Sequence, residues 1–199
     1  MLPATLKKQH LYYNLRQANM GVFNFFSKPK YKLADSLIPK ICLTPIPNEI
    51  SSLIDKINWA DFETAYGNAK NTIPFYLKNL FCIDTEIAMD ATHQLWCSLC
   101  HQHAFISPAS LPAYDILKIG LLNLDDKFKI EILDIFQGFS DCTSNDYFAN
   151  TKHPPEKWEL ELRQKLISDI DIFNELSSNN NEEISHFATT ICEGLLNAS

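Results

Sequence analysis

Apolar residues recur at helical spacing along almost the whole chain, and this pattern limits the fold more than any other feature of the sequence. Residues at i, i+3, i+4 and i+7 share one face of an α-helix. Three such stripes are Ile50, Leu53, Ile54 and Ile57; Phe128, Ile132, Ile135, Phe136 and Phe139; and Ile184, Phe187, Ala188, Ile191, Cys192 and Leu195. Residues 156–178 predict a further, long helix. Because no segment shows sustained alternation of apolar and polar residues, we predict an all-α fold.

Glycine is scarce, with only 5 in 199 residues, and this supports the same fold class. Tight hairpins and phosphate-binding loops both use glycine, because it adopts positive φ without steric strain. No P-loop motif and no dinucleotide-binding glycine motif occurs in the sequence. An all-β fold and a glycine-rich nucleotide site are therefore disfavoured.

A repeat lies in the middle of the chain. Residues 72–76 (TIPFY) resemble residues 110–114 (SLPAY), and each begins with a hydroxyl residue, Thr72 or Ser110, that is a candidate N-cap. A second helix is predicted after each, over 84–101 and over 125–139. Helix pairs of about 40 residues are typical of HEAT and armadillo repeats. We therefore predict an α-solenoid of HEAT-like helical hairpins, with an irregular helical bundle as the alternative.

The second helix of the first repeat carries apolar residues on two sides. One side holds Ala88, Ala91, Leu95 and Leu99, and another holds Met89, Trp96 and Cys100. A helix with two apolar sides must be covered by two neighbours. This is what a central unit of a helical stack requires.

Three regions are predicted along the chain. Residues 1–47 contain a candidate helix from Leu6 to Ala18 and a basic, proline-containing linker. Residues 48–140 contain the HEAT-like core. Residues 141–199 begin with a segment rich in turn formers, 141–155, and then supply a helical pair that caps the stack.

Charge is distributed unevenly. The net charge of −7 combines +6 in residues 1–40 with −13 in the rest of the chain. An acidic body disfavours nucleic acid as a partner, because phosphate contacts need clustered cations. It suits a basic protein partner. A solvated acidic surface that keeps the protein in solution explains the charge equally well.

The chain has no apolar run of about 20 residues that would span a bilayer, and no secretory signal at its N-terminus. We therefore expect no membrane contact and a cytoplasmic location. The six cysteines are then expected to be reduced thiols.

Several short motifs within residues 57–140 resemble a family of bacterial HEAT-like repeat proteins. These motifs are Trp59, Ala65–Ala69 (AYGNA), Ile73-Pro74, Leu95–Gln102 (LWCSLCHQ) and Ser107–Ser110 (SPAS). The sequence departs from the family pattern after Gln102, where it has His103-Ala104-Phe105-Ile106. Some members look like immunity proteins encoded beside polymorphic or contact-delivered toxins. The resemblance implies a protein-binding role and supplies no catalytic residue.

Six side chains are candidates for partner binding: Glu63, Tyr66, His101, His103, Asp125 and Asp126. Tyrosine and acidic residues are suited to an interface with a basic protein. The alternative for Tyr66, as for Trp59, is a packing role with a satisfied polar tip. For Asp125 and Asp126 the alternative is interaction with the dipole of the helix that they begin.

Cys97, Cys100 and His101 form a CxxCH pattern, which also occurs at haem-attachment sites and metal sites. His93, Cys97 and His101 in addition lie four residues apart, a spacing that places them on similar faces of one helix. One straight helix cannot surround a metal ion, and buried cysteines often serve as small apolar residues. We therefore expect no metal and no cofactor, and keep this cluster as a weak alternative for a metal protein or thiol enzyme.

The sequence as a whole predicts a non-enzymatic, immunity-type inhibitor that binds a cognate toxin, plausibly a basic, nuclease-like one. A general scaffold or adaptor without a toxin partner is the alternative.

Overall fold

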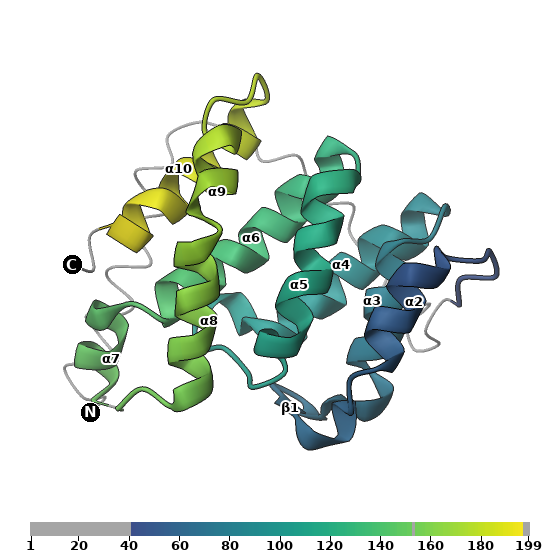
Figure 1. The fold of residues 1–199 in the computed structure, drawn as a ribbon, viewed down its shortest axis with the longest axis horizontal. Helices are drawn as coiled ribbons and strands as arrows, with labels where there is room; N and C mark the ends of the chain where they lie inside the picture. Colours follow the sequence, from purple (N-terminus) through teal and green to yellow (C-terminus); the bar gives the residue numbers. More distant parts are fainter. Residues whose placement is uncertain (1–40, 153, 197–199) are drawn as a thin grey trace, which may run out of the picture. The chain divides into compact units, whose positions relative to one another are not determined.

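Nine α-helices make up most of the part of the chain that the structure, a computed structural model, describes: residues 41–152 and 154–196 (Figure 1). They are α2 (Asn48–Asp55), α3 (Ile73–Leu80), α4 (Thr85–Leu99), α5 (Ser110–Asn123), α6 (Asp126–Cys142), α7 (Asn145–Thr151), α8 (Lys157–Ser168), α9 (Ile170–Leu176) and α10 (Glu182–Leu196). None of these helices is long and apolar enough to cross a bilayer. The prediction of an all-α fold is confirmed.

Short 3₁₀ helices and one small hairpin connect the first helices. The 3₁₀ helices are η1 (Trp59–Asp61), η2 (Ala69–Asn71) and η3 (His101–His103). The hairpin consists of β1 (Glu63–Thr64) and β2 (Gly67–Asn68), which pair antiparallel with Glu63 opposite Asn68. These connections matter for function, because the candidate site is built from the hairpin and η3.

The helices pack in successive pairs that form two layers within the described residues. α3 packs against α4, α5 against α6, and α9 against α10. Across the pairs, α3, α5 and α8 lie side by side, and α4, α6 and α10 form the layer behind them (Figure 1). The pairing follows the predicted order of hairpins. That these pairs form a HEAT-like solenoid and not an irregular bundle stays a prediction.

Helix α6 lies at the centre of the core. Phe136 contacts Tyr114 of α5, Phe139 and Phe173 of α9 edge-to-face, with ring centroids 5.1, 5.9 and 5.6 Å apart. All four rings are at most 1% exposed. Edge-to-face pairs of this kind add stabilisation beyond burial alone. The aromatic cluster therefore joins both layers.

Helix α4 is covered fully on one of its predicted apolar sides and in part on the other. Ala88, Ala91, Leu95 and Leu99 on the first side are each 0% exposed. On the second side Cys100 is buried, whereas Met89 and Trp96 are only partly buried. The neighbours of α4 are α3 and α6, so this helix lies between two others as predicted, with its second side incompletely covered.

Of the two predicted hydroxyl caps, Thr72 occupies the N-cap position of α3 as predicted, whereas the prediction for Ser110 is wrong. Thr72 precedes α3 but makes no side-chain capping bond, and its Oγ1 donates to the Ala69 carbonyl at 3.4 Å. Ser110 is the first residue of α5, and its Oγ donates to the Leu99 carbonyl at 2.9 Å. The physical reason is that carbonyls left free by the preceding segment compete for the same hydroxyl groups.

The single long helix predicted over residues 156–178 is broken in two at Asp169. This residue has φ −100° and ψ 14° and separates α8 from α9. The sequence pattern gives no sign of the break, because the apolar spacing continues across it. Its cause is tertiary, since the Asp169 carboxylate bonds to two side chains of α5.

The segment predicted as a loop over residues 141–155 contains α7. The Ser144 hydroxyl accepts a hydrogen bond from the Tyr147 backbone N–H at 3.1 Å and so caps this helix. Tyr147 in turn donates from its hydroxyl to the Ala104 carbonyl at 3.2 Å. Capping and this long-range contact stabilise a helix that its turn-forming composition disfavours.

The expectation of six reduced cysteines is wrong for two of them. Cys42 and Cys82 form a disulfide, with Cα atoms 5.8 Å apart, that joins the start of the described chain to the α3–α4 connection. The sequence does not indicate this pairing, because it depends on the distance between the two Cα atoms in the folded chain. Cys97, Cys100, Cys142 and Cys192 are free thiols. The predicted helix over residues 6–18 and the linker up to residue 40 lie outside the described residues.

Candidate functional site

The hairpin of β1 and β2 presents Tyr66 at the surface. Gly67 has φ 109°, a value that favours glycine, and the Thr64 hydroxyl closes the turn by donating to the Gly67 carbonyl at 2.8 Å. Two backbone bonds fasten the hairpin to the helices: Ala65 N–H donates to the Ser98 carbonyl, and Ala109 N–H donates to the Glu63 carbonyl, each at 3.1 Å. A small turn is thereby held against the end of α4.

The adjoining segment, η3, has an unusual backbone. His101 has φ 26° and His103 has φ 57°, values that non-glycine residues rarely adopt. The free carbonyls at the end of α4 are satisfied by the segment that follows, since the Ser107 and Ser110 hydroxyls donate to the carbonyls of Ser98 and Leu99. Positive φ costs about 1–3 kcal/mol per residue. Such a cost is often found where a segment has a functional role.

Tyr66, His101 and Phe105 form a contiguous set of rings that we call the aromatic surface. The Tyr66 hydroxyl lies 3.3 Å from His101 Nδ1, and the two rings meet edge-to-face at 5.7 Å. The His101 ring lies 5.2 Å from that of Phe105. Tyr66 is 68% exposed and Phe105 is 40% exposed. Exposed aromatic residues on an ordered backbone are typical of protein-binding sites.

His103 faces inward and supports this surface from below. Its Nε2 lies 2.9 Å from Asp134 of α6, and its Nδ1 lies 3.9 Å from Asp141. Burial lowers the pKa of His103, but the hydrogen bond and charge of Asp134, with the charge of Asp141, outweigh this and raise it above its ordinary value. The raised pKa favours the imidazolium form, whose single positive charge lies beside two carboxylates of α6 and links η3 to that helix.

Gly138 of α6 lets η3 approach closely. A Cβ atom at this position would lie 2.8 Å from Cys100 Cβ and 2.9 Å from His103 Cδ2. Both distances are shorter than ordinary van der Waals contact. The glycine therefore provides the space in which the loop rests on α6.

A second group of polar side chains lies beside Tyr66. Cys97 Sγ is 3.7 Å from His93 Nε2, one helical turn earlier in α4. Partial desolvation, followed by the charge and hydrogen bond of Cys97, raises the pKa of the Tyr66 hydroxyl. Cys97 therefore contacts both an imidazole and the phenol of the aromatic surface.

The weak metal alternative named Cys97, Cys100 and His101, and the structure directs these side chains to different neighbours. Cys100 is buried and donates from Sγ to the Trp96 carbonyl at 3.4 Å. His101 faces Tyr66, and Cys97 faces His93. Burial raises the pKa of Cys100 well above its usual value, which disfavours the thiolate that a metal requires. Within the described part of the chain, no group of three or more His, Cys, Asp or Glu side chains is arranged to hold a metal ion.

Four segments that pack next to η3 or next to the helices that contact it carry acids and no Lys or Arg. These elements are α4 with its N-cap residue, η3, residues 130–142 of α6, and α7, and they pack against one another. Their acidic residues are Asp84, Glu86, Asp90, Glu131, Asp134, Asp141 and Asp146. We refer to them as the acidic elements. Their potential favours a basic partner.

The six predicted partner-binding residues fall into two groups. Tyr66, His101 and His103 come together at the hairpin and η3, although His103 serves as support. Glu63 belongs to the same hairpin, where its side chain accepts from Asn68 Nδ2 at 3.2 Å. Asp125 and Asp126 lie at the start of α6, 8 or more residues before Asp134 and so more than about 10 Å along the helix. They do not belong to the aromatic surface.

Phe105 is the residue that the predicted set missed. It lies three residues after Gln102, in the stretch where the sequence departs from the family pattern. That departure was the signal that would have found it. His93 was considered only as a metal ligand, and its actual partner is the Cys97 thiol.

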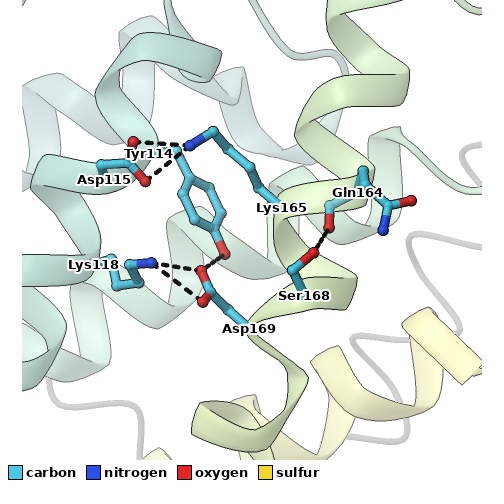
Figure 2. A network of polar contacts seen from close by, with 7 residues as sticks. All are labelled: Tyr114, Asp115, Lys118, Gln164, Lys165, Ser168 and Asp169. Carbon is cyan, nitrogen blue, oxygen red and sulfur yellow. Dashed lines mark hydrogen bonds and ion pairs between the residues drawn. The ribbon is translucent and has the colours of Figure 1, made fainter.

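A separate groove of about 600 Å³ lies between α5 and α8. Figure 2 shows its polar network. The Tyr114 hydroxyl donates to Asp169 at 3.0 Å, Lys118 pairs with Asp169 at 2.9 Å, and Lys165 pairs with Asp115 at 2.8 Å. Lys118 and Lys165 also lie 5.9 and 5.4 Å from the centre of the Tyr114 ring.

The polar network in the groove holds α5 and α8 together, and its lysine and aspartate charges are used in pairing with each other and not left for a ligand. Each lysine is already paired with an aspartate, and each pair connects α5 with α8 or with the break after it. Burial, followed by the charge and hydrogen bond of Asp169, raises the pKa of Tyr114 far above its usual value, so the phenol stays protonated and donates. The network therefore explains how the two helices are held together.

Comparison of the chain with known protein families, with curated proteins and with solved structures finds no match. The class that the fold defines is an all-α protein of paired helices. The resemblance to bacterial HEAT-like repeat proteins stays a prediction.

Proposed function

We propose that this protein acts by binding another protein at the aromatic surface, and not by catalysing a reaction. The observation that carries the proposal is the 68% exposed ring of Tyr66 on a hairpin bonded to both α4 and the start of α5. Exposed aromatic residues on a rigid backbone contribute large contact area at a small entropic cost. The strained backbone of η3 beside it supports the same assignment.

The chemistry of the partner follows from charge. The acidic elements contain no Lys or Arg, and η3 and the C-terminal end of α4 among them adjoin the aromatic surface. Of the lysines elsewhere in the described residues, several are paired with acids, including Lys78 with Asp55 and Lys129 with Asp126. A negative potential accelerates encounter with a basic protein and repels nucleic acid. We therefore propose a basic protein partner.

We propose further that the partner is a cognate bacterial toxin, such as a basic nuclease-like enzyme, which this protein neutralises as an immunity-type inhibitor. The resemblance described above and the charge of the acidic elements support this reading. A bacterial cytoplasmic location belongs to the same proposal. The Cys42–Cys82 disulfide argues against that location, because cytosolic thiol pools keep most cysteines reduced.

Co-expression with the product of the adjacent gene tests the proposal. If that product is toxic alone, co-expression of this protein should restore growth, and the two should co-purify. Tyr66→Ala and Phe105→Ala should each weaken binding by about tenfold or more, as hot-spot aromatic residues do. Ile83→Ala is the matched control, because Ile83 is 83% exposed and lies outside the aromatic surface, and it should bind like wild type.

Three results would count against the proposal. A toxic neighbour that this protein neither binds nor neutralises would remove the immunity function. A stable complex with a non-toxic housekeeping protein would favour the scaffold alternative. Equal binding by all three variants would move the binding site away from the aromatic surface.

A further inference from the structure

We propose that Cys97 is a modification site, a thiol that undergoes exchange with low-molecular-weight disulfides with His93 as its proton acceptor. The proposal rests on the arrangement of a nucleophile, a base and a phenol at the surface. Cys97 Sγ lies 3.7 Å from His93 Nε2, and it interacts electrostatically with the Tyr66 hydroxyl. His93 and Tyr66 are both exposed, so a small reagent reaches this group from solvent.

The other cysteines of the chain are unsuited to this reaction. Cys42 and Cys82 are joined to each other. Cys100, Cys142 and Cys192 are buried, and Cys97 alone among the free thiols is half-exposed. Burial raises the pKa of Cys100 well above its usual value and that of Cys142 to about 12, so both remain protonated. Thiol–disulfide exchange requires the thiolate.

The exchange step balances with the groups present. His93 Nε2 takes the proton from Cys97, and the Cys97 thiolate attacks one sulfur of the reagent disulfide. The reagent S–S bond breaks as the new S–S bond to Cys97 forms, and the departing thiolate takes up the proton. Cys97 is oxidised and the reagent's second sulfur is reduced.

Among the described residues, titratable groups near Cys97 come from α4, the hairpin and η3. His93 lies on α4 itself, Tyr66 lies on the hairpin, and His101 of η3 lies 3.3 Å from the Tyr66 hydroxyl. Cys100, just after α4, interacts electrostatically with Cys97. The imidazole of His93, 3.7 Å from the Cys97 sulfur, is within reach of its proton.

Modification of Cys97 has a consequence for the aromatic surface. A bulky group on Sγ occupies the space next to the Tyr66 hydroxyl and displaces the ring. This consequence rests on the proposed function, because it predicts weaker partner binding. The reaction itself does not depend on any partner.

The experiment uses oxidised glutathione and the full chain. Intact-protein mass spectrometry should show one glutathionyl group, and peptide mapping should place it on Cys97. Cys97→Ser should abolish the adduct, and Cys192→Ser should leave it unchanged. Near pH 7, His93→Gln should slow the reaction by about threefold or more, since only the thiolate attacks. His186→Gln, at an exposed histidine of α10, is the matched control and should react at the wild-type rate.

Some outcomes would overturn the proposal. One is an adduct that maps to a different cysteine. Another is a His93→Gln variant that is folded by circular dichroism and reacts at the wild-type rate across pH 6–8. A modified protein that still binds its partner would remove only the effect on binding. A confirmed adduct without any partner would leave the site in place and remove only the proposed function.

Discussion

His101 and His103 show how single residues define the candidate site. Both adopt positive φ, and the cost is offset by groups that sequence spacing does not connect, such as Asp134 beneath His103. The sequence identified both histidines as candidates because they follow the LWCSLC stretch. It did not indicate that one ring faces outward and the other inward. The opposite orientations of the two rings follow from the backbone conformation of η3, and that conformation depends on contacts with residues distant in the sequence.

The His103–Asp134 ion pair predicts a pH-dependent stability. The folded-state pKa of His103 is raised, so the stabilisation is fully present below its unfolded pKa of about 6.5 and is lost as pH rises through the folded-state value. We expect the substitution His103→Asn to destabilise the protein more at pH 5.5 than at pH 8.5. Asparagine is chosen because it tolerates the positive φ of this position. Urea unfolding at both pH values measures this, with His186→Asn as the control. An equal loss at both pH values would contradict the ion pair.

Gly138 predicts a steric effect at one position. Gly138→Ala should destabilise the protein by about 1–3 kcal/mol, because the new methyl group overlaps Cys100 and His103. Gly120→Ala is the matched control in α5, where the methyl group meets the flexible end of Ile132 at 2.9 Å. It should cost clearly less, since that side chain can shift and alanine favours the helix. Thermal or urea unfolding of the two variants makes the comparison.

At the scale of elements, the sequence predicted where helices occur better than where they end. The apolar stripes of α4, α6 and α10 correspond to observed helices because burial of one face determines both the stripe and the helix. The break at Asp169 and the presence of α7 were not predictable from local pattern. Each depends on a long-range contact, from Asp169 to α5 and from Tyr147 to Ala104. Element boundaries therefore reflect tertiary bonds more than propensity.

The Asp169 break predicts a specific loss of stability. Asp169→Ala should destabilise the protein by about 2 kcal/mol, because the Tyr114 hydroxyl and Lys118 lose their common acceptor. Tyr114→Phe should cost somewhat less, about 1–2 kcal/mol, since Lys118 keeps its partner. Asp171→Ala, at an exposed position on α9, is the control and should have little effect. Urea unfolding gives the three values, and a neutral Asp169→Ala would show that the break has another cause.

For the molecule as a whole, the fold class could be predicted from the sequence, but the Cys42–Cys82 disulfide could not. Helical spacing and scarce glycine were sufficient for an all-α prediction. The order of paired helices was visible in the repeat of residues 72–76 and 110–114. The Cys42–Cys82 bond was not, because cysteine pairing is decided by distance in the folded chain. The aromatic surface was predicted in part, through Tyr66 and His101, and was missed at Phe105.

The disulfide predicts a measurable contribution to global stability. It closes a loop with a sequence separation of 40, for which chain entropy gives up to about 4 kcal/mol of stabilisation. We expect Cys42→Ser, or treatment with a reductant, to lower the free energy of unfolding by about 2–4 kcal/mol. Cys192→Ser without reductant is the control. In denaturant without reductant, the 4 free cysteines should react with a thiol reagent, and reaction of all 6 would refute the bond.

The close contact at Gly138 has a consequence for how such a surface can change. Tyr66 and Phe105 point into solvent and can be exchanged for other side chains at little cost to folding. Gly138, which lies beneath η3, cannot be exchanged in the same way, because any side chain larger than its hydrogen atom pushes the loop outward. Such a protein can acquire a new binding specificity through changes at the exposed residues Tyr66 and Phe105. The buried position 138, which contacts no partner, must stay glycine.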